Sequence, residues 1–157
     1  MNHKERLRNE IFAWNTLEKA PYAVLAMADL DGKPYCIPVT PGADRLHGYI
    51  YIHCAESGLK LELIKSNPKV CLTAVSKAQS VPREFEMAYE SAVFSGYVEE
   101  VDNRTEKIKG LHIIAERYDP TGMDRFNEVI SRLVDATCVL KIVTEEITGK
   151  EACYPQV

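Results

Sequence analysis

The stretch that most constrains the fold is residues 49–69, where a strand-forming segment leads directly into a short helical one. Residues 49–54 are rich in aromatic and β-branched side chains and carry His53 near their end, which predicts a buried strand. Ser57 is a favourable N-cap, so we expect a helix that opens at Gly58. Pro68 should end that helix, because proline disfavours helical geometry in the residue before it.

Lys60 would be the third residue of this helix, where a capping box normally has Glu or Gln. A cation in the first turn costs about 0.3–1 kcal/mol through the helix dipole. A phosphate held between the ammonium and the free backbone N–H groups would reverse that sign. The alternative is that Lys60 points into water, where salt screens the dipole.

The length of 157 residues fits a single domain, residues 1–157. A formal net charge of −4, without any block of Lys and Arg, argues against nucleic acid or an anionic membrane as the main partner. No apolar stretch approaches the length of a membrane span, and residues 1–17 carry charges throughout. We therefore expect a cytoplasmic protein.

The cysteines and histidines show no metal-ligand spacing, so no metal site is expected. Four cysteines lie among strand-forming residues and are expected to be small buried hydrophobes in a reducing compartment. The fifth, Cys153, is near the end of the chain. The other four are Cys36, Cys54, Cys71 and Cys138. Among the histidines, His53 alone precedes a possible anion site; the other interpretation is that it is a packing residue.

Helices are expected at residues 3–19, from the Asn103 cap to Tyr118, and at 124–134. The first belongs to an N-terminal helical segment, 1–20, and the others to a helical insertion, 103–135, before the last strand. Residues 77–86 are expected to form a loop, 148–150 a turn followed by a loose tail, and Gly96 a bulge. Strands are expected at residues 22–28, 34–40, 49–54, 70–75, 89–101 and 137–143.

Six strands joined mostly by short links favour antiparallel pairing and a small barrel with peripheral helices, an α+β fold that is mainly β. Pro38 interrupts the second strand, which predicts an edge, a bulge or a ligand there, ordinary edge geometry being the commoner cause. A doubly wound parallel sheet is excluded, and no dinucleotide fingerprint, P-loop, G-x-S-x-G or H-E-x-x-H motif is present.

His53, Ala55, Gly58 and Lys60 form the pattern His-x-Ala-x-x-Gly-x-Lys. With this pattern as its most specific match, the chain resembles the FMN-binding split-barrel family, in particular pyridoxamine 5′-phosphate oxidase-like proteins of the nitroimidazole-resistance type. The resemblance covers roughly residues 22–150. Its other segments are residues 32–35, 37–39, 67–70, 89–93, 96, 106–107 and 148–150.

This resemblance implies a homodimer of six-stranded antiparallel split β-barrels with FMN in grooves between the subunits. The flavin would lie along two strands and contact mostly backbone, with its phosphate at Ser57 and Lys60. His53 would be the catalytic residue near the flavin or the substrate, and Ser91 would face the same groove. The remaining implied contacts are Ile37, Pro38, Val39, Thr40, Tyr51, Ile52, Cys54 and Ala55.

The hypothesis that follows is an FMN-dependent oxidoreductase, a flavin reductase or nitroreductase-like enzyme that passes electrons from NAD(P)H to a small acceptor. A flavin supplies its own redox chemistry, which accounts for the missing catalytic motif. One alternative is a split barrel that binds flavin, deazaflavin or haem without turnover; another is an empty dimeric scaffold. Cys54 occupies a position that is commonly small in the family. The arginine-rich phosphate clamp of true pyridoxamine phosphate oxidases is not evident, which argues against pyridoxamine 5′-phosphate as substrate.

Overall fold

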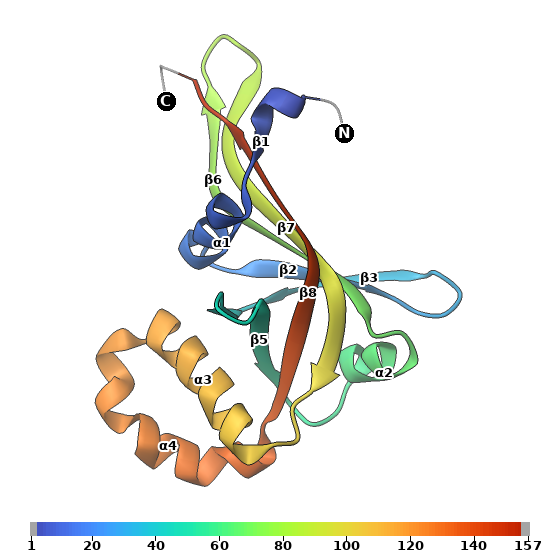
Figure 1. Ribbon diagram of the computed structural model, residues 1–157, viewed down its shortest axis with the longest axis vertical. Coiled ribbons are helices and arrows are strands. Elements are labelled where there is room, and N and C mark those ends of the chain that lie inside the picture. Colours follow the sequence, from blue (N-terminus) through green and yellow to red (C-terminus); the bar gives the residue numbers. More distant parts are fainter. Residues whose placement is uncertain (1–2, 155–157) are drawn as a thin grey trace.

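A computed structural model describes residues 3–154, and within them eight strands form one antiparallel sheet (Figure 1). The strand order is β3-β2-β6-β7-β8-β5-β4, and β1 pairs with β8. The six longer strands correspond to the six expected from the sequence, whereas β1 and β4 are short additions. The strands are β1 (Leu7–Arg8), β2 (Ala23–Ala28), β3 (Pro34–Val39), β4 (Gly42–Asp44), β5 (Tyr49–Cys54), β6 (Lys69–Val81), β7 (Glu86–Glu100) and β8 (Cys138–Ala152).

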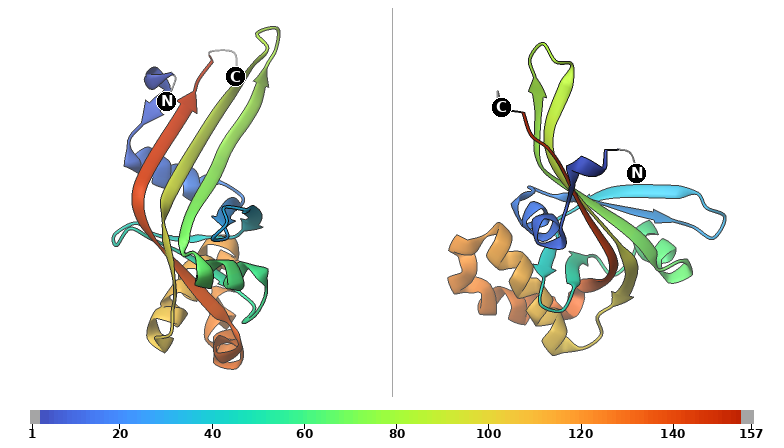
Figure 2. Two further views of the ribbon diagram at one scale, coloured as in Figure 1. Left: turned by 90° about the vertical axis from the view of Figure 1, so that its right-hand side faces the viewer. Right: turned by 45° about the horizontal axis from the view of Figure 1, so that its top comes forward.

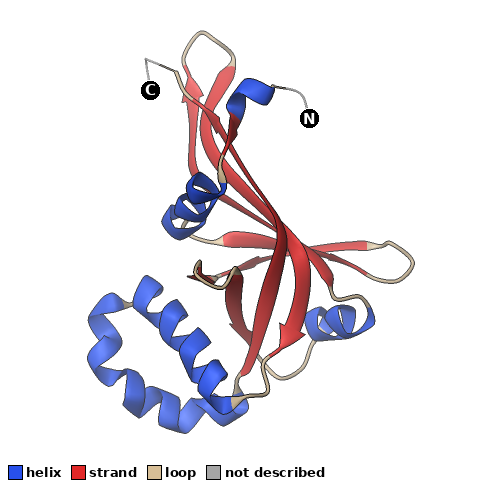
Figure 3. Cartoon of the chain, in the orientation of Figure 1, coloured by secondary structure: helices blue, strands red, loops and turns tan. Residues whose placement is uncertain are grey.

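The pairing order does not close on itself, because β3 and β4 are its two edges, and the fold is a split β-barrel. Helices lie around its periphery (Figure 3). The described α-helices are α1 (Glu10–Lys19), α2 (Leu59–Ser66), α3 (Arg104–Tyr118) and α4 (Phe126–Leu133). Short 3-10 segments are η1 (Lys4–Arg6), η2 (Pro120–Arg125) and η3 (Val134–Ala136). Within residues 3–154, no helix has both the length and the apolarity needed to cross a bilayer.

Strand β5 is buried on both faces, which explains the unbroken apolar run of residues 49–52. Ile50 and Ile52 point into the main core, where the ring of Trp14 from α1 packs against Phe94 of β7 with 4.8 Å between centroids. Tyr51 points the other way, into a second core beneath α3 and α4. The strand therefore holds two hydrophobic clusters together.

Strands β6 and β7 are longer than expected and form an arm that projects beyond the barrel (Figure 2). The predicted loop at 77–86 is wrong, since only the turn between β6 and β7 lies outside strands. The predicted turn at 148–150 is also wrong: these residues pair with β7, Lys150 opposite Ser91. Many of the arm's residues are exposed, so its sequence is polar and lacks the apolar run by which we recognised the buried strands.

The ends of several helices also differ from expectation. The N-terminal helix begins at Glu10 rather than His3, because the Asn9 side chain accepts a hydrogen bond from the Phe12 amide and caps it there. Met1 and Asn2 lie outside the described residues. The helix expected over 124–134 is divided among η2, α4 and η3.

Two local predictions are confirmed. Asn103 caps α3 through a 3.0 Å hydrogen bond from the Glu106 amide, and α3 ends at Tyr118. The β7–β8 register shifts between Ser95 and Gly96. A Cβ at Gly96 would lie 2.0 Å from the Val143 carbonyl oxygen, so only glycine fits this bulge.

The central part of one face of the sheet carries no charged side chain across β3, β2, β6 and β7, and Lys69, at the start of β6, lies at its border. Cross-strand register places its members together and opposite the core face, on which α1 packs. Thr73 and Ser91 on this face donate their hydroxyl hydrogens to backbone carbonyls of neighbouring strands. We call it the uncharged face; its members are Val24, Ala26, Cys36, Pro38, Cys71, Thr73, Val75, Ser91, Val93 and Ser95.

All five cysteines are free thiols, and they differ in exposure. Cys36 is exposed rather than buried as expected, because it lies on the outer side of the edge strand β3. Cys54 and Cys71 are half-buried, and Cys138 is buried opposite Cys54. Burial, with further contributions from Cys54 and Glu100, raises the pKa of the Cys138 thiol to about 12, so it is a packing residue at neutral pH.

Candidate functional site

The end of β3 and the end of β5 meet at one pocket, which we call the polar pocket. Its volume is about 240 Å³. Pro38 and Val39 come from β3, and Thr40 follows directly. His53 and Lys60 line the same pocket from β5 and α2. Five of the residues expected at the site therefore lie together, although they come from three separate elements.

Helix α2 opens differently from the predicted pattern. Its N-cap is Gly58, not Ser57, and Gly58 has φ of 133°, a backbone conformation that suits glycine. Ser57 is exposed, and no side chain caps the first turn. Lys60 is consequently the second helical residue rather than the third. The first amide groups of the helix are left without a capping side chain, beside a lysine.

Lys60 is half-buried in the polar pocket and carries its charge without a partner. Among residues 3–154, neither an ion pair nor a hydrogen bond joins its ammonium to another side chain. Lys107 and Lys150 are also half-buried and likewise show no side-chain partner among residues 3–154, so what distinguishes Lys60 is its place in a pocket and in an uncapped first helical turn. A lysine in the uncapped first turn of a helix, lining a pocket, is an arrangement that favours an anion.

His53 lies at the mouth of the polar pocket. Burial lowers the pKa of its imidazole, and the Lys60 ammonium lowers it further. Both effects disfavour a second positive charge, so His53 is a neutral imidazole at neutral pH. In that form one ring nitrogen donates a hydrogen bond and the other accepts one.

A second pocket of about 330 Å³, the apolar pocket, shares Thr40 and His53 with the polar pocket. One wall is α3, with Leu111 and Ile114 facing the cavity. Another wall is α4, from which Phe126, Val129 and Ile130 line the pocket. The two pockets are therefore neighbours that share two lining residues, with an ammonium lining one and mainly hydrocarbon lining the other.

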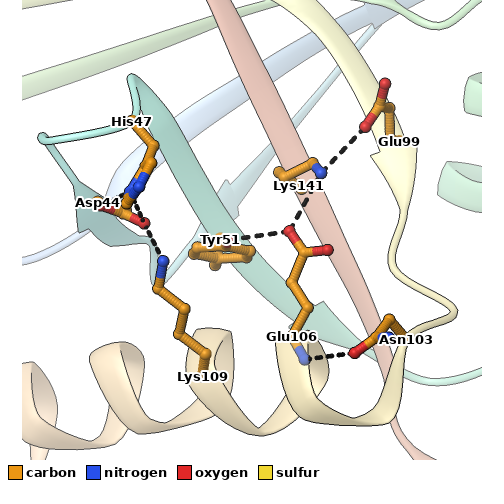
Figure 4. Close-up of polar contacts among 8 residues, drawn as sticks. All are labelled: Asp44, His47, Tyr51, Glu99, Asn103, Glu106, Lys109 and Lys141. Atoms are coloured by element: carbon orange, nitrogen blue, oxygen red, sulfur yellow. Dashed lines mark hydrogen bonds and ion pairs between the residues drawn. The ribbon is translucent and has the colours of Figure 1, made fainter.

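A partly buried polar cluster holds α3 against the sheet (Figure 4). Glu106 accepts hydrogen bonds of 3.1 Å from the Tyr51 hydroxyl and from the Lys141 ammonium. Lys141 also lies 3.1 Å from a carboxylate oxygen of Glu99. Burial alone would raise the pKa of Glu106, but the hydrogen bonds from Lys141 and Tyr51 outweigh it and hold this pKa below its ordinary value.

Two further residues of α3, Lys109 and Arg117, fix the same helix. Lys109 donates a 2.6 Å hydrogen bond to Asp44, which also contacts the His47 ring at 2.9 Å (Figure 4). Arg117 donates hydrogen bonds to three backbone carbonyls, those of Leu17, Ala20 and Pro41. Because Pro41 follows Thr40, Arg117 fixes the chain at the junction of the two pockets.

The other residues expected at the site lie elsewhere. Ile37, Ile52 and Cys54 pack in or against the main core, and Tyr51 lies in the second core. Ala55 and Ser57 are exposed in the link between β5 and α2, and Ser91 lies on the uncharged face. None of these seven side chains lines either pocket. Contacts to a ligand at these positions would have to come from backbone atoms or, for Ser91, through the uncharged face.

Sequence reasoning missed Tyr22 and the apolar pocket. Tyr22 immediately precedes β2 in the sequence and lines the polar pocket. The sequence showed it only as the first residue of an apolar run. The apolar pocket is made by side chains that the sequence pattern assigned to the buried faces of α3 and α4. Periodicity identifies an apolar face but does not show that two such faces leave a gap.

Comparisons with known proteins agree with this architecture, which defines a split barrel with a two-part pocket at its strand ends. A family profile described as pyridoxamine 5′-phosphate oxidase matches residues 11–151. The chain belongs to this family of FMN-binding split-barrel proteins. No curated protein sequence gives a significant match.

Three solved structures illustrate the similarity. A candidate 5-nitroimidazole antibiotic resistance protein from Bacteroides thetaiotaomicron is 25% identical, with a TM-score of 0.76 over 92% of this chain and 85% of the other. A flavocytochrome from Azotobacter vinelandii is 17% identical, with a TM-score of 0.82 over 100% of this chain and 74% of the other. An FAD- and haem-binding protein from Mycobacterium smegmatis is 19% identical, with a TM-score of 0.72 over 92% of this chain and 71% of the other.

Proposed function

We propose that this protein is an FMN-dependent oxidoreductase, a flavin reductase or nitroreductase-like enzyme that takes electrons from NAD(P)H and passes them to a small acceptor. The observation that carries the proposal is the Lys60 ammonium in the polar pocket, which has no side-chain partner among residues 3–154 and belongs to the uncapped first turn of α2. That arrangement suits the phosphate of FMN, the anionic end of the cofactor. The family profile and the flavin-binding proteins of the same fold support it.

The residues present fit such a cofactor. Lys60 and the first amides of α2 would hold the phosphate, and the chain near Pro38, Thr40 and His53 would lie along the flavin. When bound, the flavin supplies the redox chemistry. The chain's own task is to hold it, keep His53 neutral as a hydrogen-bond donor and acceptor, and leave access for a second molecule.

We further propose a homodimer in which the uncharged face meets its counterpart. Four adjacent strands present only small, apolar or hydroxyl side chains there, and Thr73 and Ser91 already bond to their own backbone neighbours. Burying such a face costs little polar desolvation. Pro38 belongs both to the uncharged face and to the lining of the polar pocket. A dimer formed through this face would therefore place FMN at the subunit interface.

Flavin binding tests the phosphate site. Lys60→Ala should weaken FMN binding roughly tenfold or more, the effect of losing a hydrogen bond to a charged group. Riboflavin, which lacks the phosphate, should bind both proteins equally. Lys65→Ala, in the last turn of the same helix, is the matched control and should bind FMN as the wild type does. Equal FMN affinity in all three proteins would refute the placement.

Turnover tests the activity. The purified protein should be yellow, lose its flavin absorbance when NAD(P)H is added without oxygen, and regain it with an acceptor. His53→Ala should retain FMN but slow this cycle. A yellow protein that NAD(P)H does not reduce would instead be a flavin-binding protein without this activity, and a colourless protein unaffected by FMN would be a scaffold.

Light scattering tests the interface. Val75→Arg places a charge in the uncharged face and should convert a dimer to monomers, whereas Gln79→Arg, further along the exposed arm, should not. Val75→Arg that remains dimeric would assign the interface to another surface.

A further inference from the structure

The apolar pocket is not accounted for by a phosphate site, and its volume limits what it can hold. An apolar cavity of about 150 Å³ accommodates one benzene molecule. The apolar pocket measures about 330 Å³. It therefore has room for a planar ligand of about two fused rings.

The lining disfavours an anionic ligand. Leu111, Ile114, Phe126 and Val129 present hydrocarbon, and no cationic side chain lines this pocket. The carboxylate of Asp119 at the pocket accepts hydrogen bonds from the Thr121 hydroxyl and the Gly122 amide, and it would repel an anion. An anionic ligand would lose its hydration without gaining a partner.

The polar groups at the shared mouth specify one hydrogen-bonding end. Thr40 and His53 line both pockets, so a ligand in the apolar pocket meets them on the side that faces the polar pocket. The neutral imidazole of His53 can donate a hydrogen bond to a carbonyl oxygen without needing a counter-ion. A molecule seated here would be adjacent to whatever occupies the polar pocket.

We infer that the apolar pocket binds a neutral, planar, two-ring aromatic carbonyl compound, of which a naphthoquinone is the redox-active form, with its carbonyl oxygen toward His53. As an electron acceptor this compound depends on the proposed flavin function. The reduced flavin would be oxidised by two electrons with release of two protons, and the quinone would gain two electrons and two protons to become a hydroquinone. Binding itself requires no flavin.

A fluorescent naphthyl ketone, 6-propionyl-2-dimethylaminonaphthalene, is a suitable probe because it is neutral, has two fused rings and does not react with thiols. It should bind the purified protein, and its emission should shift to the blue on binding. Val129→Trp, which fills the pocket, should weaken binding roughly tenfold or more. Asn127→Trp, at an exposed position of the same helix, should leave it unchanged. Ala115→Leu fills the pocket from α3 and gives an independent check if Val129→Trp fails to fold.

Ligand chemistry and FMN separate the possible outcomes. Naphthalene-2-carboxylate, an anion of the same ring size, should compete at least roughly tenfold less well than 2-acetylnaphthalene. Equal competition, or equal probe affinity in Val129→Trp and the wild type, would overturn the inference. If FMN displaces the probe stoichiometrically, the apolar pocket belongs to the flavin ring and the inference is also wrong. Probe binding without any FMN binding would leave the pocket assignment standing while the proposed flavin function fails.

Discussion

The cations beneath α3 and the lysine in the first turn of α2 differ in whether oxygen atoms of the chain pair with them. Beneath α3 every cation described above has oxygen partners: Lys109 has Asp44, Lys141 has Glu99 and Glu106, and Arg117 has three carbonyls. At α2, Lys60 has none within residues 3–154. The first group therefore supports the fold, whereas the position of Lys60 in the polar pocket is what the proposed phosphate site uses.

Arg117 should give the largest effect on stability, because its guanidinium holds carbonyls from the end of α1, from Ala20 beyond it and from the Pro41 link. Arg117→Met should lower the free energy of unfolding by about 3 kcal/mol, since the hydrogen bonds it removes involve a charged donor. Urea denaturation of the apoprotein measures this. Arg125→Met is the control: its ion pair with Glu128 is exposed, so the change should stay within about 0.5 kcal/mol. Equal stability of the two variants would remove Arg117 from the fold-supporting group.

Glu106→Gln should lower the free energy of unfolding at neutral pH by about 1–2 kcal/mol, because Tyr51 and Lys141 lose their ionised acceptor. The effect should depend on pH. The folded protein lowers the pKa of Glu106 below its ordinary value of 4.5, so its contribution is present above that pH and is lost as pH falls through the lower folded value. Wild type and variant should therefore converge in acid. A constant difference from neutral pH to acid would show that packing, not the charge, is responsible.

Those two variants test residues whose partners come from distant parts of the chain. Such pairings could not be predicted from the sequence. The strand 49–54, the Asn103 cap and the Gly96 bulge follow from local chemistry and were predictable. The pairing of Lys141 with Glu106, or of Arg117 with Leu17, joins elements far apart in sequence and has no local signature.

The candidate site divides in the same way. Lys60 was identifiable because a lysine in a first helical turn conflicts with the helix dipole. The arm of β6 and β7 was missed because exposed strands need no apolar alternation. Tyr22 and the apolar pocket were missed because a gap between buried faces depends on how α3 and α4 pack, which the pattern of each helix alone does not contain.

Lys60 and Lys65 on α2 sharpen the comparison with a smaller effect. In phosphate-free buffer, Lys60→Ala should be more stable than Lys65→Ala by about 0.3–1 kcal/mol, because a cation is unfavourable in the first turn of a helix and favourable in the last. Since the two substitutions are identical, helix propensity cancels. Inorganic phosphate should then stabilise the wild type and Lys65→Ala against urea but not Lys60→Ala. Stabilisation of all three would place the anion elsewhere.

His53 provides the smallest and most local test, because it reports the field of Lys60 without altering the fold. The folded protein lowers the pKa of His53 through burial and the nearby ammonium. Since burial persists in Lys60→Ala, this variant should raise the pKa only part of the way toward the ordinary value of 6.5. A bound phosphate anion should raise it in the wild type, because its negative charge offsets the ammonium and favours the imidazolium. NMR titration of the His53 ring protons measures both shifts. Lys65→Ala is the control: its His53 pKa, with and without phosphate, should equal that of the wild type. If phosphate leaves the His53 pKa unchanged in the wild type, the anion does not enter the polar pocket. Lys60 is then a lysine without an anion-binding role.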